Sequence, residues 1–274
     1  MTSANYDKTF GALKRLYGEH GYALLRELHI CVVGLGGVGS WTAESLARTG
    51  IGRLTLIDYD TVSLSNINRQ LPALTTTAGQ KKFSVLQERI AQINPECQCN
   101  CIDDFVSPDN LSTLLSPDHR FDYVIDACDG IRVKAAMIHH CKRNKIPIIT
   151  TGGAGGLTDP THIQVADLSR TYNDPLAAKV RSTLRGQYGF AKNGQRSFGI
   201  ECVFSSQQPV YPQPDGSVSH RKPDMHGVSL DCRFGYGSVS FVTANFGFVA
   251  ASRAINKLLH KRAAHPQESP DNNA

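Results

Sequence analysis

Two features in the first quarter of the chain have the residue types and the spacing of a nucleotide site. The first is a glycine-rich turn after an apolar stretch, Ile30-Cys-Val-Val-Gly34-Leu-Gly36-Gly37-Val-Gly39. The second is Asp58, which ends the next apolar stretch, nineteen residues after Gly39. Glycines let backbone N–H groups at the start of a helix approach phosphates, and a carboxylate after the second strand can bind ribose hydroxyls. The pattern therefore predicts that Gly34, Gly36, Gly37 and Gly39 form a phosphate turn and that Asp58 binds a ribose.

The loop after Asp58 favours a triphosphate over a dinucleotide. It contains Asp60, Ser65, Asn66, Arg69 and Gln70, whereas a dehydrogenase needs only one acid at this place. Arg69 can bind phosphate oxygens in a bidentate manner, Asn66 can donate a hydrogen bond to them, and Lys82 adds a positive charge. Each cation taken alone also fits an ordinary surface residue. Together with the glycine turn they indicate a triphosphate.

Alternating strands and helices must position these residues. Apolar stretches predict strands near residues 30–34, 53–57, 98–103, 122–126 and 146–150, and periodic stretches predict helices near 5–28, 38–49, 79–93, 108–115 and 131–143. The alternation predicts an α/β fold, a Rossmann-like and mostly parallel sheet with helices on both faces. The ligand of such a sheet lies at the carboxyl ends of the strands, where the strand order reverses.

After Thr151 the pattern changes. A strand is predicted at 162–168 and a basic helix at 175–188, which indicates a smaller C-terminal β/α extension. We therefore divide the chain into an N-terminal helical segment (1–28), a nucleotide-binding Rossmann-like domain (29–150), a C-terminal region of the same domain for substrate or dimer contacts (151–262) and a disordered tail (263–274).

Composition agrees with an ordinary globular enzyme. The 274 residues are 41% hydrophobic and 19% charged, and the formal net charge is +5, which permits a polyanionic partner such as RNA without requiring one. The eight cysteines contain no C-x-x-C pair, and Cys97, Cys99 and Cys101 alternate as on one face of a strand, so core packing is favoured over metal binding there. This cysteine usage and an N-terminus without the pattern of a signal peptide predict a cytoplasmic protein.

The segment Phe234–Ser252 could be mistaken for a membrane span, because its 19 residues carry no charge. Eight of them are Gly, Ser, Thr or Asn, and a helix with so many small polar residues inserts poorly. We expect a buried helix that packs on the sheet or on a second subunit, and no membrane partner.

In its motifs the chain resembles the ubiquitin-activating-enzyme-like adenylyltransferases. Within that superfamily it most resembles the bacterial tRNA threonylcarbamoyladenosine dehydratases. The wider resemblance is carried by Gly34-Leu-Gly-Gly-Val-Gly39, Asp58-Tyr-Asp60, Ser65-Asn66-Ile-Asn68-Arg69-Gln70, Gly79-x-x-Lys82 and Asp126-Ala-Cys-Asp129. The narrower one is carried by Arg15-Leu-Tyr-Gly, Asn144–Gly156, Asp174–Lys179, Cys202–Ser205 and Phe246–Ala250.

The resemblance implies cofactors and roles for particular residues. ATP and Mg²⁺ are the implied cofactors, with a monovalent cation as a further candidate. Asp129 corresponds to the magnesium-associated aspartate of the family, and Asp126 is either a second carboxylate near the metal or a loop anchor. Arg15 corresponds to an arginine finger that reaches the ATP of a neighbouring subunit, which implies a homodimer. The implied catalytic residues are Arg15, Arg69, Lys82 and Asp129.

The resemblance also implies the reaction. The carboxylate of threonylcarbamoyladenosine in tRNA is adenylated, and the ureido group of the same modification then closes an oxazolone ring and releases AMP. Such intramolecular attack needs no enzyme thiol. Residues 151–200 contain no cysteine for a thioester, and Cys202 and Cys232 remain candidates for a sulfur carrier, although structural roles are favoured. Lys179, Arg181, Arg185, Arg196, Arg221 and Lys222 are candidates for tRNA contacts by charge alone.

Two other functions stay open at this point. One is activation of a ubiquitin-like carrier or of a sulfur-transfer partner, such as the sulfur-acceptor protein of a cysteine desulfurase system. The other is a nicotinamide-binding oxidoreductase or redox sensor, which would bind NAD tightly and release no pyrophosphate.

Overall fold

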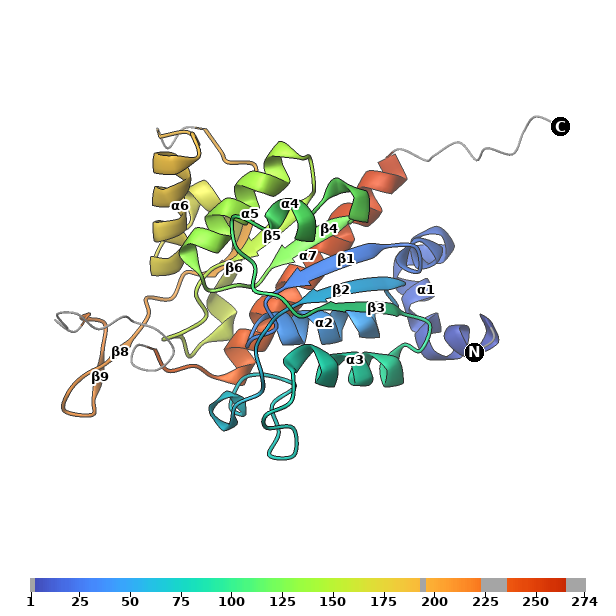
Figure 1. Ribbon diagram of the computed structural model, residues 1–274, viewed down its shortest axis with the longest axis horizontal. Coiled ribbons are helices and arrows are strands. Elements are labelled where there is room, and N and C mark those ends of the chain that lie inside the picture. Colours follow the sequence, from blue (N-terminus) through green and yellow to red (C-terminus); the bar gives the residue numbers. More distant parts are fainter. Residues whose placement is uncertain (1–2, 193–195, 223–235, 265–274) are drawn as a thin grey trace.

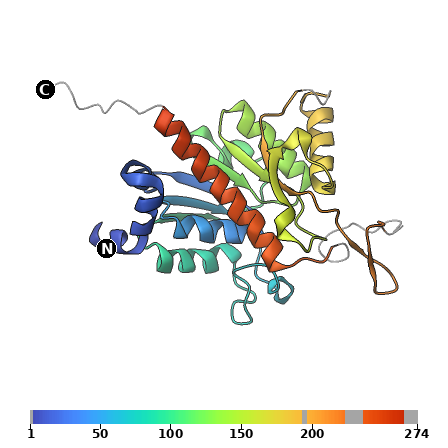
Figure 2. The ribbon, with the colours of Figure 1, turned by 180° about the vertical axis from the view of Figure 1, so that it is seen from behind.

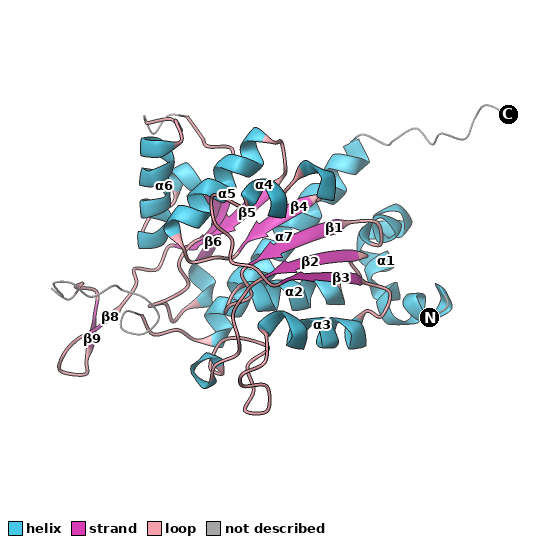
Figure 3. Cartoon of the chain, in the orientation of Figure 1, coloured by secondary structure: helices cyan, strands magenta, loops and turns pink. Residues whose placement is uncertain are grey.

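The computed structural model describes residues 3–192, 196–222 and 236–264. Strands and helices alternate through its first half (Figure 1), and the strands form one central sheet with helices on both sides (Figure 3). The helices are α1 (Ser3–Leu25), α2 (Gly39–Arg48), α3 (Lys82–Ile93), α4 (Leu111–Leu114), α5 (Ile131–Arg143), α6 (Pro175–Gln187) and α7 (Ser240–Ala264). The strands are β1 (His29–Val33), β2 (Arg53–Ile57), β3 (Gln98–Ile102), β4 (Tyr123–Asp126), β5 (Ile148–Thr151), β6 (Ile163–Asp167), β7 (Glu201–Ser205), β8 (Tyr211–Pro212) and β9 (Val218–Ser219).

The main sheet has seven strands in the order β3-β2-β1-β4-β5-β7-β6. All neighbouring pairs are parallel except β6 and β7. The chain runs outward from β1 to β3 and then returns to place β4 on the other side of β1. The strand order therefore reverses between β1 and β4, which is where open parallel sheets bind their ligands. The predicted fold class is confirmed.

Alternate residues of each strand point to opposite faces of the sheet, and each face has its own apolar core. On β1, Ile30 and Val32 pack in the cluster that includes residues of α2, α3 and α7, whereas Cys31 and Val33 pack in the cluster that includes residues of α4, α5 and α6. Figure 2 shows α7 crossing the first of these faces as one long diagonal helix. Burial on both faces explains why the central strands are continuous apolar stretches.

The uncharged segment that ends at Ser252 enters α7 at Ser240, and its residues 240–252 form the first half of that helix. Residues 236–239 precede the helix, and Phe234 and Gly235 lie outside the described residues. The packing of this segment on the sheet is confirmed, because Val242, Phe246 and Ala250 are all buried in the core. At Gly247 the helix crosses α2 so closely that a Cβ atom would lie 2.6 Å from the carbonyl oxygen of Val38. Within the described part of the chain, no helix is long and apolar enough to cross a membrane.

Three predicted helices differ from the observed ones in their extent. Gly18 breaks α1 with φ 73° and ψ 173°, so the prediction of one regular helix over residues 5–28 is wrong at that point. The prediction for 79–93 is wrong at its start, because residues 79–81 pair with Thr61 and Val62 and the helix begins at Lys82. The helix predicted over 108–115 is shorter in the structure, where only Leu111–Leu114 (α4) are α-helical.

The second half of the chain extends the same sheet. β7 pairs with β5 in parallel, and β6 runs antiparallel at the far edge. The short hairpin of β8 and β9 projects from the end of the molecule opposite α1 (Figure 1). Helix α7 runs to Ala264, so the predicted tail boundary at residue 263 falls inside it, and residues 265–274 lie outside the described part. At the opposite edge of the sheet, Cys97 lies just before β3 and Cys99 and Cys101 lie on it. All three pack against the core, which confirms their predicted packing role.

Candidate active site

The glycine turn connects β1 to α2, and two of its glycines are required by the fold. Gly34 has φ 86°, a conformation that other residues rarely adopt. A Cβ atom on Gly39 would lie 1.7 Å from the carbonyl oxygen of Gly34. A Cβ atom on Gly36 would meet nothing closer than 3.9 Å, where Nε2 of Gln70 lies. Gly36 therefore leaves open space at the start of α2, where backbone N–H groups and the helix dipole favour an anion.

Asp58 lies beside this turn at the end of β2. It is only 8% exposed, and its carboxylate accepts hydrogen bonds from the backbone N–H groups of Leu35 (2.5 Å) and Asp60 (2.8 Å). Two such bonds leave further lone pairs on a carboxylate free to accept ligand hydroxyls. The structure thus brings Asp58 and the glycine turn together, as predicted.

The loop from residue 63 to residue 70 covers the turn on another side. The Cβ position of Gly37 lies 3.4 Å from Cγ of Arg69, so this arginine lies against the glycine turn. The backbone carbonyl of Arg69 accepts hydrogen bonds from Nε1 of Trp41 (3.0 Å) and Oγ1 of Thr243 (3.4 Å). Helices α2 and α7 therefore hold the backbone from which the Arg69 side chain extends.

The guanidinium of Arg69 has no carboxylate partner within ion-pair distance among the described residues. Its Nη1 donates to the carbonyl of Ser65 (2.9 Å) and to Oδ1 of Asn68 (3.0 Å), which leaves further N–H groups for a ligand. Asn66 uses Oδ1 to accept from the N–H of Ser63 and cap its short helical turn (3.0 Å), so only its amide NH₂ remains free for phosphate. Gln70 is 8% exposed, and its Oε1 is buried without a hydrogen-bond partner in the described structure.

Lys82 begins α3 and is buried to 4% exposure. Its ammonium donates to Oδ2 of Asp60 at 2.7 Å, and the side chain of Asp60 is 47% exposed. An incoming phosphate can take the place of the exposed Asp60 carboxylate, so the buried ammonium of Lys82 would keep an anionic partner. The structure therefore joins Lys82 to Asp60, a contact that the sequence did not reveal.

The loop after β4 meets the glycine turn from the opposite side. The Cβ position of Gly34 lies 3.1 Å from the backbone nitrogen of Cys128. Asp129 is exposed on this loop, and its charge contributes to raising the pKa of the Cys128 thiol, although burial is the larger cause. An exposed carboxylate beside a phosphate turn fits the hard oxygen ligands that Mg²⁺ prefers.

Asp126 has a different environment from Asp129. It is fully buried and pairs with the equally buried ammonium of Lys134 at 3.0 Å. Thr150 donates to the same carboxylate at 2.6 Å, and the N–H of Cys128 donates at 3.1 Å. These contacts favour the loop-anchor interpretation of Asp126 over direct metal contact.

Comparisons with known proteins establish the family of the chain. A sequence profile of the ThiF family matches residues 9–273. The chain belongs to the ThiF family.

Two relatives of this ThiF chain resemble it over nearly the whole length. The tRNA threonylcarbamoyladenosine dehydratase of Escherichia coli is 53% identical over 96% of the chain and 98% of its own length. The dehydratase of the same name from Haemophilus influenzae is 52% identical over 94% of the chain and 96% of its own length. A crystal structure of the Escherichia coli dehydratase in complex with ATP superimposes with a TM-score of 0.85 at 48% identity, covering 97% of this chain and 99% of that one.

Arg15 does not join the other predicted site residues within one copy of this ThiF chain. It is exposed on α1, which leads into the amino end of β1. The glycine turn follows the carboxyl end of the same strand, so the two lie at opposite ends of the sheet (Figure 1). A role for Arg15 at the nucleotide therefore requires a second subunit.

Cys202, one of the two candidates for a sulfur carrier, is wholly buried on β7. Burial raises the pKa of its thiol, and the nearby Asp174 carboxylate adds to the effect. A buried thiol kept protonated is a poor nucleophile, so the structural interpretation of Cys202 is favoured. Cys232 lies outside the described residues.

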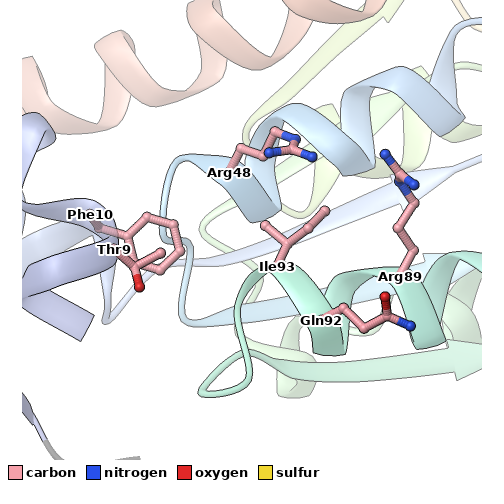
Figure 4. A pocket seen from close by; sticks show the side chains of 6 residues that line it. All are labelled: Thr9, Phe10, Arg48, Arg89, Gln92 and Ile93. Carbon is pink, nitrogen blue, oxygen red and sulfur yellow. The ribbon is translucent and has the colours of Figure 1, made fainter. Parts of the chain in front are cut away.

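Two surface clefts of this ThiF chain lie away from the predicted site residues. One, of about 460 Å³, lies between α1, α2 and α3 and is lined by Thr9, Phe10, Arg48, Arg89, Gln92 and Ile93 (Figure 4). Both arginines bind the buried Glu44 carboxylate, and these bonds outweigh burial and lower the pKa of Glu44. The predicted nucleotide-binding residues line neither of these two clefts, and a phosphate cradle of backbone N–H groups does not need to be a deep cavity.

Sequence reasoning missed Lys134, which anchors Asp126 from beneath the site. A signal was present, because Lys134 shares the helical spacing of Ile131, Ile138 and Cys141 on the buried face of α5. A charged residue on such a face requires a buried partner.

Proposed function

We propose that this chain is a tRNA threonylcarbamoyladenosine dehydratase that uses ATP to adenylate the threonyl carboxylate of the modified nucleoside. The observation that carries the proposal is the convergence of the glycine turn, Asp58, Arg69 and Asp129 at the point where the strand order reverses. Full-length similarity to two dehydratases of that name supports it.

The chemistry follows from what the site residues can supply. A carboxylate oxygen of the substrate attacks the α-phosphorus of ATP, and the bond to pyrophosphate breaks. Arg69 and Lys82 stabilise the charge on the phosphates, and Asp129 would hold Mg²⁺ against them. The ureido group then attacks the acyl carbon, AMP leaves, and one proton is released, so the nucleoside loses one water in total.

The atom that closes the ring decides the product. Attack by the ureido oxygen gives the oxazolone that we propose, whereas attack by a ureido nitrogen gives a hydantoin of the same mass. Both routes use the same acyl adenylate, so the site residues have the same roles in each.

Charge distribution supports an RNA substrate. Residues 130–222, the basic part of the chain, contain thirteen lysines and arginines and only five aspartates and glutamates. Residues 1–129 contain eleven lysines and arginines and fifteen aspartates and glutamates. The basic part, residues 130–222, includes α6 and the β8–β9 hairpin (Figure 1). Lys179, Arg196, Arg221 and Lys222 are exposed there and can meet phosphates. Arg181 and Arg185 instead donate to Thr171 and to the carbonyl of Ala191, so they stabilise the fold.

The proposal includes a homodimer in the cytoplasm. The support for a dimer is the separation of Arg15 from the nucleotide site within one copy, because an arginine finger on α1 could act only on a partner. Carrier activation is the weaker candidate, since residues 151–200 contain no cysteine and Cys202 is buried.

Incubation with ATP, Mg²⁺ and tRNA carrying threonylcarbamoyladenosine tests the function. We expect nucleoside mass analysis to show loss of one water, with one AMP and one pyrophosphate formed per event. Arg69→Ala and Asp129→Ala should abolish this conversion without unfolding the protein, because both side chains contact solvent. Wild-type protein that leaves the nucleoside mass unchanged, or that transfers AMP to a carrier protein instead, would contradict the proposal.

A further inference from the structure

The layer formed by α5 and α6 carries positive charge without acidic residues of its own to balance it. Residues 130–158 and residues 175–200 each contain five lysines and arginines, and neither stretch contains an aspartate or a glutamate. The two helices pack against each other on one face of the sheet, whereas α7 packs on the other face. A surface of one sign attracts a partner of the opposite charge.

At the carboxyl ends of these two helices, aromatic and cationic side chains hold the segment that follows α6. The rings of Phe190 and Phe198 lie 5.0 Å apart. The ammonium of Lys142 donates to the carbonyl of Phe198 and lies 5.4 Å from the ring centroid of Phe190. The guanidinium carbon of Arg185 lies 5.4 Å from the ring centroid of Phe198. Lys142 and Arg185 therefore stabilise the fold here, and so does Asp167, which accepts from the N–H of Phe198 at 2.9 Å.

Four more cations stand at the same place without such a role: Arg143, Lys145, Lys192 and Arg196. Arg143 is the last residue of α5, and Lys145 follows two residues later. Lys192 lies two residues after Phe190, and Arg196 lies two residues before Phe198. All four side chains are exposed, and none of them makes a hydrogen bond or an ion pair within the part of the chain that the structure describes. We call them the α5–α6 basic cluster.

Lys145 has a backbone conformation that costs a lysine stability. It follows Asn144, the C-cap of α5, and its φ of 56° lies in the left-handed region. Glycine is the usual residue at this position of a helix end, because a Cβ atom is unfavourable there. Residues that break a local rule of folding are expected mainly at functional sites. This conformation is a second observation, besides charge, that points to a use of the α5–α6 basic cluster outside the fold.

The α5–α6 basic cluster lies well away from the nucleotide site. Helix α5 begins two residues after Asp129, and its 13 residues extend for about 20 Å. Arg132 is exposed in the first turn of α5 and Lys179 in the second turn of α6, so positive charge continues along both helices. A nucleic-acid strand carries one phosphate about every 3.4 Å, which gives roughly six phosphates over this distance.

We propose that the α5–α6 basic cluster binds the phosphates of a double-stranded stem of the tRNA, the stem that closes the loop carrying the modified nucleoside. The inference rests on the proposed function, which supplies the RNA. A base enters an enzyme site from a single-stranded loop, so the duplex stem lies further along the same molecule. The rings of Tyr188 and Phe190 pack on His139 and Phe198, which favours contacts to phosphates over stacking of unpaired bases. Such contacts position the RNA without reading its sequence.

Binding of tRNA, followed by fluorescence anisotropy at several salt concentrations, measures this contribution directly. We expect Arg143→Ala and Lys192→Ala each to bind tRNA about threefold more weakly and to lower the slope of log K against log salt by about 0.9, the effect of one phosphate contact. Lys145→Gly should lose the same affinity and yet unfold at the wild-type temperature or above it, because glycine is favoured at positive φ. A merely structural role of Lys145 would not combine these two results.

A matched control is Lys261→Ala. Lys261 is exposed in the last turn of α7, as Arg143 is in the last turn of α5, but α7 covers the other face of the sheet. Removing either cation has the same effect on a helix dipole, so the difference between the two variants isolates RNA binding. Lys261→Ala should bind tRNA as the wild type does, and all of these variants should keep wild-type affinity for ATP.

A second substrate locates the contact on the RNA. A short single-stranded RNA that carries the same modified nucleoside but no stem should show the wild-type KM in Arg143→Ala, whereas the KM for whole tRNA should rise about threefold. An equal rise in KM for both RNAs would overturn the proposal, since the cluster would then act on the loop.

Two further results would also overturn it. One is wild-type tRNA affinity in a protein that combines Arg143→Ala, Lys145→Gly and Lys192→Ala. The other is a loss of affinity that accompanies a lowered unfolding temperature in all three single variants. Wild-type protein that binds tRNA but converts neither RNA would contradict the proposed function alone, because the binding measurements need no turnover and still decide the role of the cluster.

Discussion

Gly36 and Gly39 belong to one turn, yet the structure predicts opposite consequences when each becomes alanine. At Gly36 the added methyl group would have no atom within 3.9 Å, and the backbone does not require positive φ there. Gly36→Ala should therefore change the free energy of unfolding by less than about 1 kcal/mol. The methyl group occupies the space left for phosphate, and a displacement of about 1 Å at the reacting group is expected to lower the rate about 100-fold.

At Gly39 the methyl group would lie 1.7 Å from the carbonyl oxygen and 2.9 Å from the carbonyl carbon of Gly34. The backbone must move, which we expect to destabilise the protein by about 3 kcal/mol or more. For a chain of this size that corresponds to a fall in the unfolding temperature of about 6–12 °C. Gly39→Ala should therefore be a stability variant, whereas Gly36→Ala should be a binding variant.

Thermal unfolding followed by circular dichroism measures the stability effect, and ATP titration by calorimetry together with the rate of nucleoside conversion measures the effect on the site. Gly186→Ala is the control, because that position of α6 has nothing within 4 Å and lies outside the proposed site. Wild-type ATP affinity in Gly36→Ala would refute the assignment of this turn to phosphate. Wild-type stability in Gly39→Ala would refute the packing argument.

Three further predictions concern a buried ion pair, a carboxylate that accepts backbone hydrogen bonds, and the arginine finger. Lys134→Met leaves the buried Asp126 carboxylate without its 3.0 Å partner, and we expect a loss of about 3–5 kcal/mol in the free energy of unfolding, measured by urea denaturation; a neutral effect would contradict the role of this ion pair as an anchor. Asp167 accepts hydrogen bonds from the N–H groups of Ser169, Phe198, Gly199 and Ile200, and these bonds together with the Ser169 hydroxyl outweigh burial and lower its pKa. A lowered pKa in the folded state means that the carboxylate stabilises the fold above its unfolded pKa of about 4 and that this stability is lost as the pH falls through the folded pKa. Asp167→Asn should accordingly cost about 2 kcal/mol at pH 7 and progressively less below pH 4; a difference from the wild type that stays constant between pH 7 and pH 3 would contradict this. Arg15→Ala and Arg69→Ala dimers should each be inactive alone. An equal mixture after subunit exchange should recover about a quarter of wild-type activity, because only half of the dimers are mixed and each of these has one intact site. No recovery in mixtures shown to contain mixed dimers would count against the arginine finger.

The local features of the site could be predicted from the sequence because their conformations depend on neighbouring residues. The spacing of Gly34 to Gly39 specifies a tight strand-to-helix turn, and Asp58 follows directly from the end of an apolar strand. The alternation of strands and helices likewise determined a parallel sheet with covered faces. Helix ends were less predictable at residues 79–81, where pairing with Thr61 and Val62 replaced the helix.

Contacts between distant segments were decided only by the tertiary structure. Asp126 and Asp129 are three residues apart and look alike in the sequence, yet one is buried on Lys134 and Thr150 while the other is exposed beside the glycine turn. The difference arises because β4 carries Asp126 into the core next to β5, whereas the loop that follows leaves the sheet. The contact between the rings of Tyr59 and Phe105, whose centroids lie 5.1 Å apart, depends in the same way on β2 and β3 being neighbours. The sequence by itself determined which chemical groups the site contains, and the order of the strands decided which of them face the ligand, because that order alone sets which loops meet at the edge of the sheet.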